Sequence, residues 1–328
     1  MIGVGRMGAF HARTLAPSPL IDIVAVADTN PEAATALADE IGAEPLTDLA
    51  AVGGRSGIDA WLISTPTITH PNVVRTAFEA GVHVLCEKPL ALDPDESEEL
   101  GADATRRGRV LQVGFWRRFA PPWAKAKELI DAGVIGRPLL VRLSQWDADP
   151  PPASFCDPAS SGGLAIDCGV HEFDLAEWLT GLSVTAVTAR VLPLVDESLA
   201  TVGDVDNLVA VLDLEGGAVA TVDLSRNCRY ADDVRTEILG SEGALFVDLL
   251  PTGRTRLATA TRDEVIPGSE TPDALAAGVL AQAEAFAAVV SGESLDYPGA
   301  RASSRAVAIG LETRRIASGS AGHPASAL

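Results

Sequence analysis

The stretch Gly3-Val4-Gly5-Arg6-Met7-Gly8 decides the fold expected for the first part of this chain. It fits the pattern G-x-G-x-x-G, whose glycines permit a tight turn and let backbone N–H groups approach a pyrophosphate at a helix start. A helix-like segment at residues 9–15 follows, and then an apolar strand candidate at residues 21–27. Asp28 ends that strand, where a carboxylate can bind both ribose hydroxyls and repel a 2′-phosphate. The pattern therefore predicts NAD as the cofactor, with NADP the less favoured choice.

The segment before the glycines departs from this pattern. Only Met1 and Ile2 precede Gly3, whereas a first strand needs about five residues. Two explanations are open here: the natural chain starts further upstream, or the strand is stunted. A glycine turn that binds no nucleotide is the simpler alternative reading of the motif.

The chain after Asp28 alternates short apolar runs with helix-like segments, which is typical of βαβ units in a parallel sheet. Prolines and capping residues mark the helix starts, with Asn30 and Pro31 as one example and Asp93, Pro94 and the capping-box acid Glu96 as another. Glycines mark the helix ends. These signals predict helices at residues 31–41, 71–80 and 94–108, and strands at residues 59–64, 82–86 and 110–114.

The second half of the chain follows another pattern. After a predicted helix at residues 122–132 come six apolar or alternating strands, at residues 139–146, 184–191, 208–214, 218–224, 234–239 and 244–249. Short glycine-containing turns separate several of them and indicate antiparallel pairing. One helix at residues 171–179 interrupts the set, and two helices, at residues 272–291 and 300–317, follow it.

The two patterns together predict two domains. We expect an α/β Rossmann dinucleotide-binding domain at residues 1–119. An α+β domain at residues 120–328, with an open and largely antiparallel sheet, is expected to bind substrate and mediate oligomerisation. The last helix is a candidate to pack back on the first domain. An open sheet with one apolar face must be covered, which predicts a homodimer or homotetramer.

Composition excludes several classes of protein. A net charge of −20 argues against a nucleic-acid partner, and a cluster of arginines at residues 106–118 is read as a solvated helix end and loop. No apolar run approaches the roughly 18 residues of a membrane span, and no secretory signal is visible. The four cysteines form no Cys-x-x-Cys pair, which favours reduced thiols and a cytoplasmic location.

Polar residues follow two of the predicted parallel strands at the edge where open α/β sheets bind ligands. Ser64-Thr65-Pro66 lies at the end of the strand at residues 59–64, and Glu87-Lys88-Pro89 follows the strand at residues 82–86. The Lys88 ammonium can hydrogen-bond a substrate hydroxyl and stabilise an alkoxide as hydride leaves. An ordinary strand-to-helix turn and a solvated lysine are the alternatives. The predicted cofactor site includes His70 and, from these stretches, Ser64, Thr65, Pro66, Glu87 and Lys88.

Asp167 and His171 lie four residues apart, so they share one face if this stretch is helical. Gly162-Gly163 before them allows close approach of the backbone to a ligand. His171 suits proton removal near neutral pH, and Asp167 can orient it or bind a second hydroxyl. A helix surface pair is the alternative. Zinc binding with Cys156 and Cys168 is disfavoured, because adjacent residues 167 and 168 face different ways and hydride transfer needs no metal.

Taken together, these motifs resemble the glucose-fructose oxidoreductase/inositol dehydrogenase (Gfo/Idh/MocA) family over nearly the whole chain. Glu87-Lys88-Pro89 matches its Glu-Lys-Pro signature, and Asp167 to His171 matches its Asp-x-x-x-His element. The resemblance implies that Lys88, Asp167 and His171 are the catalytic residues. It also implies that Pro89 follows a cis peptide bond.

Three stretches look most like inositol 2-dehydrogenases, namely residues 112–119, 135–139 and 227–240. In such enzymes the positions of Arg118 and Tyr230 line the polyol site. Residues 142–147 depart from the likeness, since those enzymes tend to carry His and Asn there. The segment 273–290 also departs, because it lacks their substrate-facing aromatic residues. Both departures fall on specificity elements, so the substrate is open between an inositol, another cyclitol and a sugar.

The implied reaction is oxidation of a secondary ring hydroxyl to a ketone, with hydride passing to nicotinamide C4. His171 would act as base and Lys88 would stabilise the alkoxide. An NAD-dependent glycoside hydrolase and a non-catalytic sugar or nucleotide sensor are the alternatives. The predicted cofactor residues are Gly3, Gly5, Arg6, Met7, Gly8, Asp28, Ser64, Thr65, Pro66, His70, Glu87 and Lys88, and the predicted substrate residues are Lys88, Arg118, Asp167, His171 and Tyr230.

Overall fold

The computed structural model describes residues 1–248 and 253–320. These residues form two compact units. The first comprises Met1–Trp116 and Gly278–Arg305, and the second comprises the rest of the described chain. The tail therefore contributes to both units, whereas the predicted domains at residues 1–119 and 120–328 are uninterrupted. Those domain limits stay a prediction.

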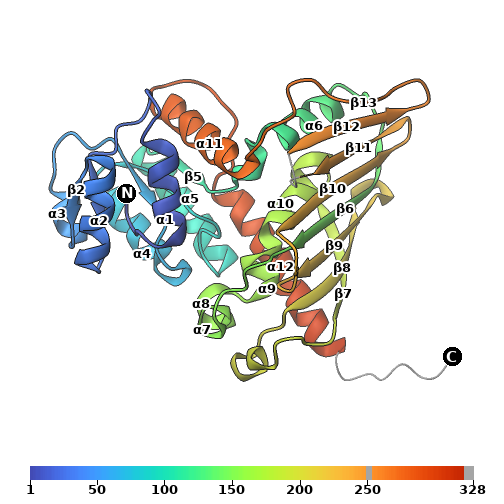
Figure 1. The fold of residues 1–328 in the computed structure, drawn as a ribbon, viewed down its shortest axis with the longest axis horizontal. Helices are drawn as coiled ribbons and strands as arrows, with labels where there is room; N and C mark the ends of the chain where they lie inside the picture. Colours follow the sequence, from blue (N-terminus) through green and yellow to red (C-terminus); the bar gives the residue numbers. More distant parts are fainter. Residues whose placement is uncertain (249–252, 321–328) are drawn as a thin grey trace. The chain divides into compact units, whose positions relative to one another are not determined.

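The first unit contains the predicted parallel strands (Figure 1). The strands are β1 (Ala25–Ala27) paired with β2 (Glu44–Leu46), and β3 (Ala60–Ile63), β4 (His83–Cys86) and β5 (Leu111–Val113) in the order β3-β4-β5. Ile2 makes single parallel bridges to Ala27 and Ile63 and thereby joins the two ladders. A single bridging residue thus stands where a first strand was expected.

Strand β1 is shorter than the segment 21–27 predicted from its apolar residues. Its partner β2 runs alongside for only three residues, so regular pairing is confined to Ala25–Ala27. Burial agrees with this, because all residues of β1 are buried while β2 is mostly exposed.

The helices of the first unit confirm most of the predicted starts and ends. Within residues 1–116 they are α1 (Arg6–Leu15), α2 (Pro31–Ile41), α3 (Leu49–Gly53), α4 (His70–Glu79) and α5 (Pro94–Arg107). Asn30 caps α2 by accepting hydrogen bonds from the amides of Glu32 and Ala33, and Gly42 ends it at φ +76°. The capping-box role predicted for Glu96 is wrong, because its carboxylate accepts hydrogen bonds from Arg75 of α4 instead.

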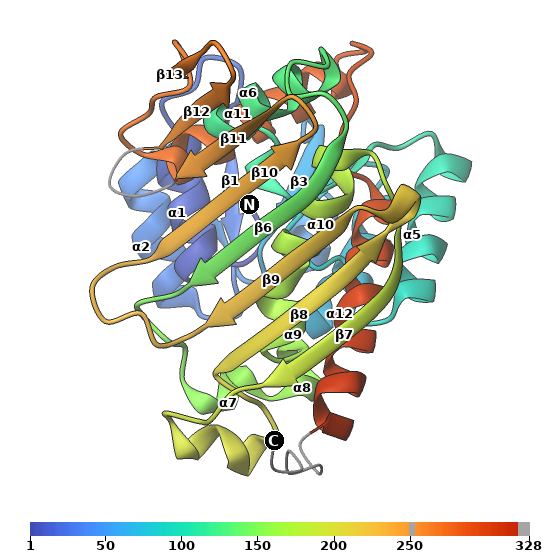
Figure 2. The ribbon, with the colours of Figure 1, turned by 90° about the vertical axis from the view of Figure 1, so that its right-hand side faces the viewer.

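The second unit is built on an eight-stranded sheet in the order β13-β12-β11-β10-β6-β9-β8-β7 (Figure 2). All neighbouring pairs are antiparallel except β6 and β9, which are parallel, so the predicted open and largely antiparallel sheet is confirmed. The strands are β6 (Pro138–Trp146), β7 (Val184–Val191), β8 (Asn207–Leu214), β9 (Val219–Ser225), β10 (Asp233–Gly240), β11 (Gly243–Asp248), β12 (Arg254–Thr259) and β13 (Asp263–Val265).

Strands β12 and β13 were not predicted from the sequence. Their residues, Arg-Thr-Arg-Leu-Ala-Thr and Asp-Glu-Val, are largely polar or charged and give no apolar run. Strand β13 is the edge strand and β12 lies next to it, and charged side chains are common at the edges of sheets.

Helices pack on one face of this sheet, chiefly α6 (Pro121–Asp131) and α10 (Gly169–Thr180). The strands alternate accordingly: Leu208, Ala210, Leu212 and Leu214 of β8 are buried, while Val211 between them is exposed. Short helices α7 (Ala153–Cys156), α8 (Pro158–Ser161) and α9 (Leu164–Asp167) lead into α10.

The tail helices are α11 (Ala274–Val290) and α12 (Ala300–Ser320), close to the ranges predicted for them. Each passes from one compact unit to the other, α11 at Ala277/Gly278 and α12 at Arg305/Ala306. Across residues 1–248 and 253–320, the helices are all too short or too polar to cross a membrane.

Candidate functional site

The glycine turn of the first unit has a geometry that other residues would not allow. Gly3 has φ +87°, and a Cβ built on it would lie 2.8 Å from the backbone of Ser64. A Cβ on Gly8 would lie 2.1 Å from the carbonyl oxygen of Gly3. The first and third glycines of the motif are thus required by close backbone approach within the protein.

Gly5, the second glycine, has a different environment. It is the N-cap of α1, and a Cβ built on it would meet no described atom within 4 Å. In the part of the chain that the structure describes, no side chain caps α1, so its first N–H groups are left for a ligand. An uncapped helix start beside open space fits the pyrophosphate of a dinucleotide.

Asp28, directly after β1, stabilises the glycine turn. It also lies at the position where a ribose is expected to bind. Its Oδ2 accepts a hydrogen bond from the Val4 amide at 2.8 Å, and its Oδ1 accepts one from the Asn30 amide at 2.8 Å. Each carboxylate oxygen can accept a further bond. The side chain can therefore still bind ribose hydroxyls, as its position predicts.

The Ser64-Thr65-Pro66 turn after β3 is tied to its neighbours by hydrogen bonds. Ser64 Oγ donates to the carbonyl oxygen of Gly3 at 2.9 Å and so closes the glycine turn. The buried ring of His70 places Nε2 2.8 Å from the Thr65 carbonyl oxygen and Nδ1 2.8 Å from the Pro89 carbonyl oxygen. Burial lowers the pKa of His70 more than these bonds and the Glu87 charge raise it.

The Glu87-Lys88-Pro89 turn after β4 is held in place by the buried side chain of Glu87. The Lys88–Pro89 peptide is cis, as the family resemblance implies. Glu87 Oε1 lies 2.6 Å from His11 Nε2 of α1, and Glu87 Oε2 accepts a hydrogen bond from the Lys88 amide at 3.1 Å. Burial opposes ionisation of Glu87, but the bond from His11 and the charges of His11 and Lys88 outweigh it and lower its pKa.

The sequence motifs did not single out His11. It lies three residues after Gly8, and it is 1% exposed on the same buried face of α1 as Gly8, Ala12 and Leu15. A histidine on the buried face of the helix that follows the glycine turn is a signal that the sequence does contain, because a buried imidazole needs a polar partner. Its partner, Glu87, lies 76 residues away and is not evident from the sequence.

Asp167 and His171 belong to the second unit. They lie in two successive helices, so the expectation that one helix carries both is wrong. Asp167 ends α9 and His171 lies in α10, with Cys168 between the two helices. Asp167 Oδ2 accepts a hydrogen bond from Arg226 at 3.3 Å, and Arg226 also donates to Asp204 at 2.7 Å. His171 is buried at the start of α10.

Gly162-Gly163 serves a contact within the protein. Gly163 has φ +71°, and a Cβ on it would lie 2.5 Å from Asp204 Oδ1. The Asp204 carboxylate comes this close because it accepts hydrogen bonds from the amide of Leu164 at the start of α9. The close approach expected for a ligand is therefore made by a side chain of this chain.

Residues 142–147, where this chain differs from inositol 2-dehydrogenases, contribute to a buried hydrogen-bond network beside α10. Gln145 accepts a hydrogen bond from Arg117 at 2.8 Å and donates to Asp147 at 3.1 Å. Asp147 is in turn 3.3 Å from the Sγ of Cys168, and burial raises the pKa of its carboxyl. Arg117 also forms a buried ion pair with Glu172.

Arg118 and Tyr230 have partners within the second unit. The guanidinium of Arg118 donates to both carboxylate oxygens of Asp174, at 2.8 and 2.5 Å. Tyr230 is 70% exposed, and its hydroxyl donates to Asp233 at 2.5 Å. Contacts of Arg118 and Tyr230 with a substrate stay predictions.

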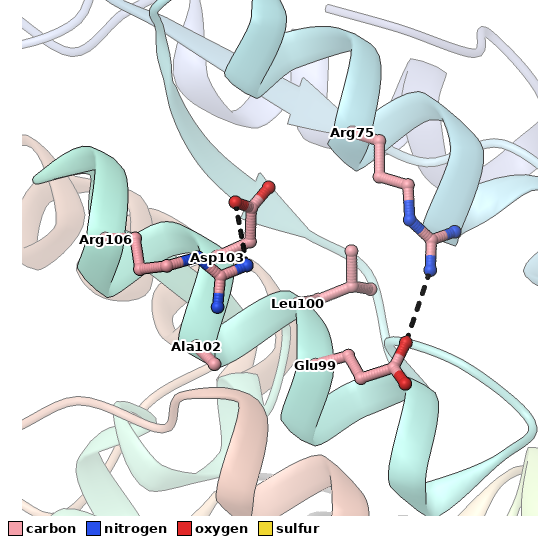
Figure 3. A pocket seen from close by; sticks show the side chains of 6 residues that line it. All are labelled: Arg75, Glu99, Leu100, Ala102, Asp103 and Arg106. Carbon is pink, nitrogen blue, oxygen red and sulfur yellow. Dashed lines mark hydrogen bonds and ion pairs between the residues drawn. The ribbon is translucent and has the colours of Figure 1, made fainter.

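Two surface pockets lie apart from most of these residues. One, of about 300 Å³, lies between α4 and α5, and its charged residues pair with one another, Arg75 with Glu99 and Arg106 with Asp103 (Figure 3). Another, of about 310 Å³, is lined by Arg226, Cys228 and neighbouring residues of the second unit. Over the described residues, His, Cys, Asp and Glu form no cluster that could hold a metal ion.

The first unit has the features of a dinucleotide-binding α/β domain. A parallel sheet, a glycine turn, an uncapped helix start and a carboxylate at the end of β1 occur together. The second unit adds an open mixed sheet with helices on one face. This combination defines the class of two-domain, nicotinamide-dependent oxidoreductases.

Comparison with known proteins agrees with this class. Residues 1–115 match the family described as "Oxidoreductase family, NAD-binding Rossmann fold", and residues 123–246 match the "GFO/IDH/MocA C-terminal domain". The scyllo-inositol 2-dehydrogenase (NAD(+)) of Bacillus subtilis is 36% identical over 275 residues, which cover 83% of this chain and 80% of that protein. The chain belongs to the Gfo/Idh/MocA family and is an NAD(P)-dependent oxidoreductase acting on CH–OH groups.

Solved structures are similar over the same extent. The crystal structure of scyllo-inositol dehydrogenase from Lactobacillus casei with bound NAD(H) and scyllo-inositol has a TM-score of 0.84 and 26% identity, with 97% of this chain and 96% of that chain covered. A UDP-N-acetylglucosamine 3-dehydrogenase from Acidithiobacillus ferrooxidans has a TM-score of 0.82 and 27% identity, with the same shares covered. These relatives act on a cyclitol and on a nucleotide-linked sugar.

Proposed function

We propose that this protein oxidises a secondary ring hydroxyl of an inositol-like cyclitol to a ketone, with NAD as the cofactor. The observation that carries the proposal is the similarity to a scyllo-inositol 2-dehydrogenase over 83% of the chain. The presence of Lys88, Asp167 and His171 at the motif positions supports it. The likeness to a UDP-N-acetylglucosamine 3-dehydrogenase favours a sugar as the second candidate substrate.

The residues of the first unit fit NAD. The free N–H groups at the start of α1 and the open space at Gly5 suit a pyrophosphate, and Asp28 suits the adenosine ribose. When bound, NAD supplies nicotinamide C4 as the hydride acceptor. The carboxylate at residue 28 disfavours the 2′-phosphate of NADP. The other proposed cofactor residues are Gly3, Arg6, Met7, Gly8, Ser64, Thr65, Pro66, His70, Glu87 and Lys88.

The proposed chemistry divides among three side chains. His171 takes the proton of the reacting hydroxyl as the carbon loses hydride, and the Lys88 ammonium stabilises the developing alkoxide. Asp167 fixes the substrate or the imidazole. Arg226 donates a hydrogen bond to Asp167 Oδ2 at 3.3 Å and so helps to hold this carboxylate in place.

The test is the absorbance of reduced nicotinamide with NAD or NADP and a panel of inositols, aldoses, aldonic acids and a UDP-linked amino sugar. We expect a rise with NAD and an inositol. Lys88→Ala and His171→Ala should each lower turnover by about 10²-fold or more, whereas Lys127→Ala, which removes an ion pair with Asp131 within α6, should not. Unchanged turnover in both site variants would refute the residue assignment.

The same measurement separates the alternatives. Cleavage of an aryl glycoside without net cofactor reduction would indicate the hydrolase, and binding without either reaction would indicate a sensor. A homodimer or homotetramer remains our expectation, and light scattering of the purified protein tests it.

A further inference from the structure

We propose that two buried histidines, His11 and His70, are positioning residues that hold the Glu87-Lys88-Pro89 turn from both sides and so fix the Lys88 ammonium. The inference rests on the role given to Lys88 in the proposed function. Neither histidine needs to touch a substrate, because each acts through the turn.

His11 holds the residue before Lys88. Its Nε2 lies 2.6 Å from Glu87 Oε1, and both side chains are buried between α1 and the end of β4. The other carboxylate oxygen of Glu87 accepts the hydrogen bond of the Lys88 amide at 3.1 Å. A Cβ on Gly114 would lie 3.2 Å from this carboxylate, so its pocket is closely fitted. The backbone amide of Lys88 is thus linked to α1 through one carboxylate.

His70 holds the residue after Lys88. Its Nδ1 is 2.8 Å from the Pro89 carbonyl oxygen, and its Nε2 is 2.8 Å from the Thr65 carbonyl oxygen. A neutral imidazole carries one N–H, so only one of these contacts at a time is a hydrogen bond, and in the Nδ1–H tautomer it is the bond to the Pro89 carbonyl oxygen. The two ring nitrogens face different turns. Replacing His70 by a side chain with its N–H donor at the δ position (Asn) or at the ε position (Gln) therefore keeps only one of the two contacts.

One contact on each side of Lys88 restricts the movement of its backbone. Its preceding side chain is bonded to α1 and its following carbonyl to α4, while its own side chain is partly exposed. Catalysis depends steeply on placement, since a displacement of about 1 Å can lower a rate about 100-fold. We therefore expect loss of His11 or His70 to lower turnover more than it weakens cofactor binding.

The chemical reactivity of the Lys88 side chain can be measured selectively, because lysine occurs only at residues 88, 125 and 127. The rate of amidination at each lysine is measured by peptide mass spectrometry on the protein without cofactor or substrate. Lys125 and Lys127 on α6 are internal controls. NADH affinity is measured by fluorescence, and turnover with the substrate found above.

The His11 test compares His11→Leu, which removes the donor, with His11→Gln, which keeps a side-chain N–H. We expect His11→Leu to change the Lys88 rate and lower kcat, each by about tenfold, with NADH affinity within about threefold. His11→Gln should restore both values to within about threefold of wild type. An unchanged Lys88 rate in His11→Leu, or equal losses in both variants, would overturn the role of His11.

The His70 test compares His70→Asn, which keeps a donor near Pro89, with His70→Gln, which reaches toward Thr65. We expect His70→Gln to lower kcat about tenfold and His70→Asn to lower it less than about threefold, with the change in the Lys88 rate following the same order. The reverse order would overturn the role of His70. His83→Asn is the matched control, since His83 accepts one backbone hydrogen bond from Val110 and an Asn oxygen can replace it.

Failure of the proposed function is distinguishable from failure of this inference. If the wild-type protein turns over none of the panel, the proposed function fails, while the Lys88 rates still test the two histidines. If turnover is found and the Lys88 rates do not respond to His11→Leu or His70→Gln, only the positioning role fails.

Discussion

Substituting the second and third glycines of the turn should separate cofactor binding from stability. Gly5 has φ −63° and ψ −170°, which alanine adopts readily, and a Cβ there would meet no described atom within 4 Å. Gly5→Ala should therefore leave the free energy of unfolding unchanged or raise it by up to about 1 kcal/mol, because alanine restricts the unfolded chain. The added methyl group occupies the space assigned to the pyrophosphate.

Gly8→Ala should show the opposite behaviour. Its Cβ would lie 2.1 Å from the Gly3 carbonyl oxygen and 2.6 Å from Ser64 Oγ, so the hydrogen bond between these two groups cannot survive. Overpacking of this kind costs about 1–3 kcal/mol. The loss of one hydrogen bond adds about 1 kcal/mol. We expect Gly8→Ala to lower the free energy of unfolding by about 2–4 kcal/mol.

The assay pairs urea unfolding with NADH titration by fluorescence. Gly5→Ala should weaken NADH binding about tenfold, which corresponds to about 1.4 kcal/mol, at wild-type stability. Wild-type affinity in Gly5→Ala would refute the placement of the pyrophosphate at the start of α1. Wild-type stability in Gly8→Ala would refute the close packing of the turn.

Three further predictions concern buried charges and thiols. Arg226 is 1% exposed between Asp204 and Asp167, so Arg226→Met should lower the free energy of unfolding by about 3–5 kcal/mol in urea titrations; a loss below about 1 kcal/mol would contradict it. Because the pKa of Glu87 is lowered, its stabilising contribution is present above the ordinary value of 4.5 and is lost as the pH falls through the folded pKa. The stability difference between wild type and Glu87→Gln should therefore shrink on acidification, and a difference that grows would count against this. Burial, with the Glu87 charge, raises the pKa of the Cys86 thiol, so iodoacetamide should alkylate native Cys86 about 100-fold more slowly than the urea-unfolded chain; equal rates would show that the thiol is accessible.

Local signals in the sequence were sufficient for most of the longer helices and strands and for their order. Asn30, Pro31 and Gly42 mark the limits of α2 to the residue, and residues 184–191 form β7 as predicted. Capping and periodicity act over a few residues, so they are legible without a fold. The same signals fail where a strand is charged, as in β12, or where its length depends on a partner, as in β1.

The sequence by itself determined a dinucleotide-binding α/β domain followed by an α+β domain, and it singled out Lys88, Asp167 and His171. Only the tertiary structure decided which groups meet: His11 with Glu87, His70 with Pro89, and Asp167 with Arg226 across 59 residues. It also decided that β6 and β9 pair in parallel within an otherwise antiparallel sheet. The physical reason is that a buried polar group must find a partner, but the order of strands and helices, rather than local spacing, decides which one lies within reach.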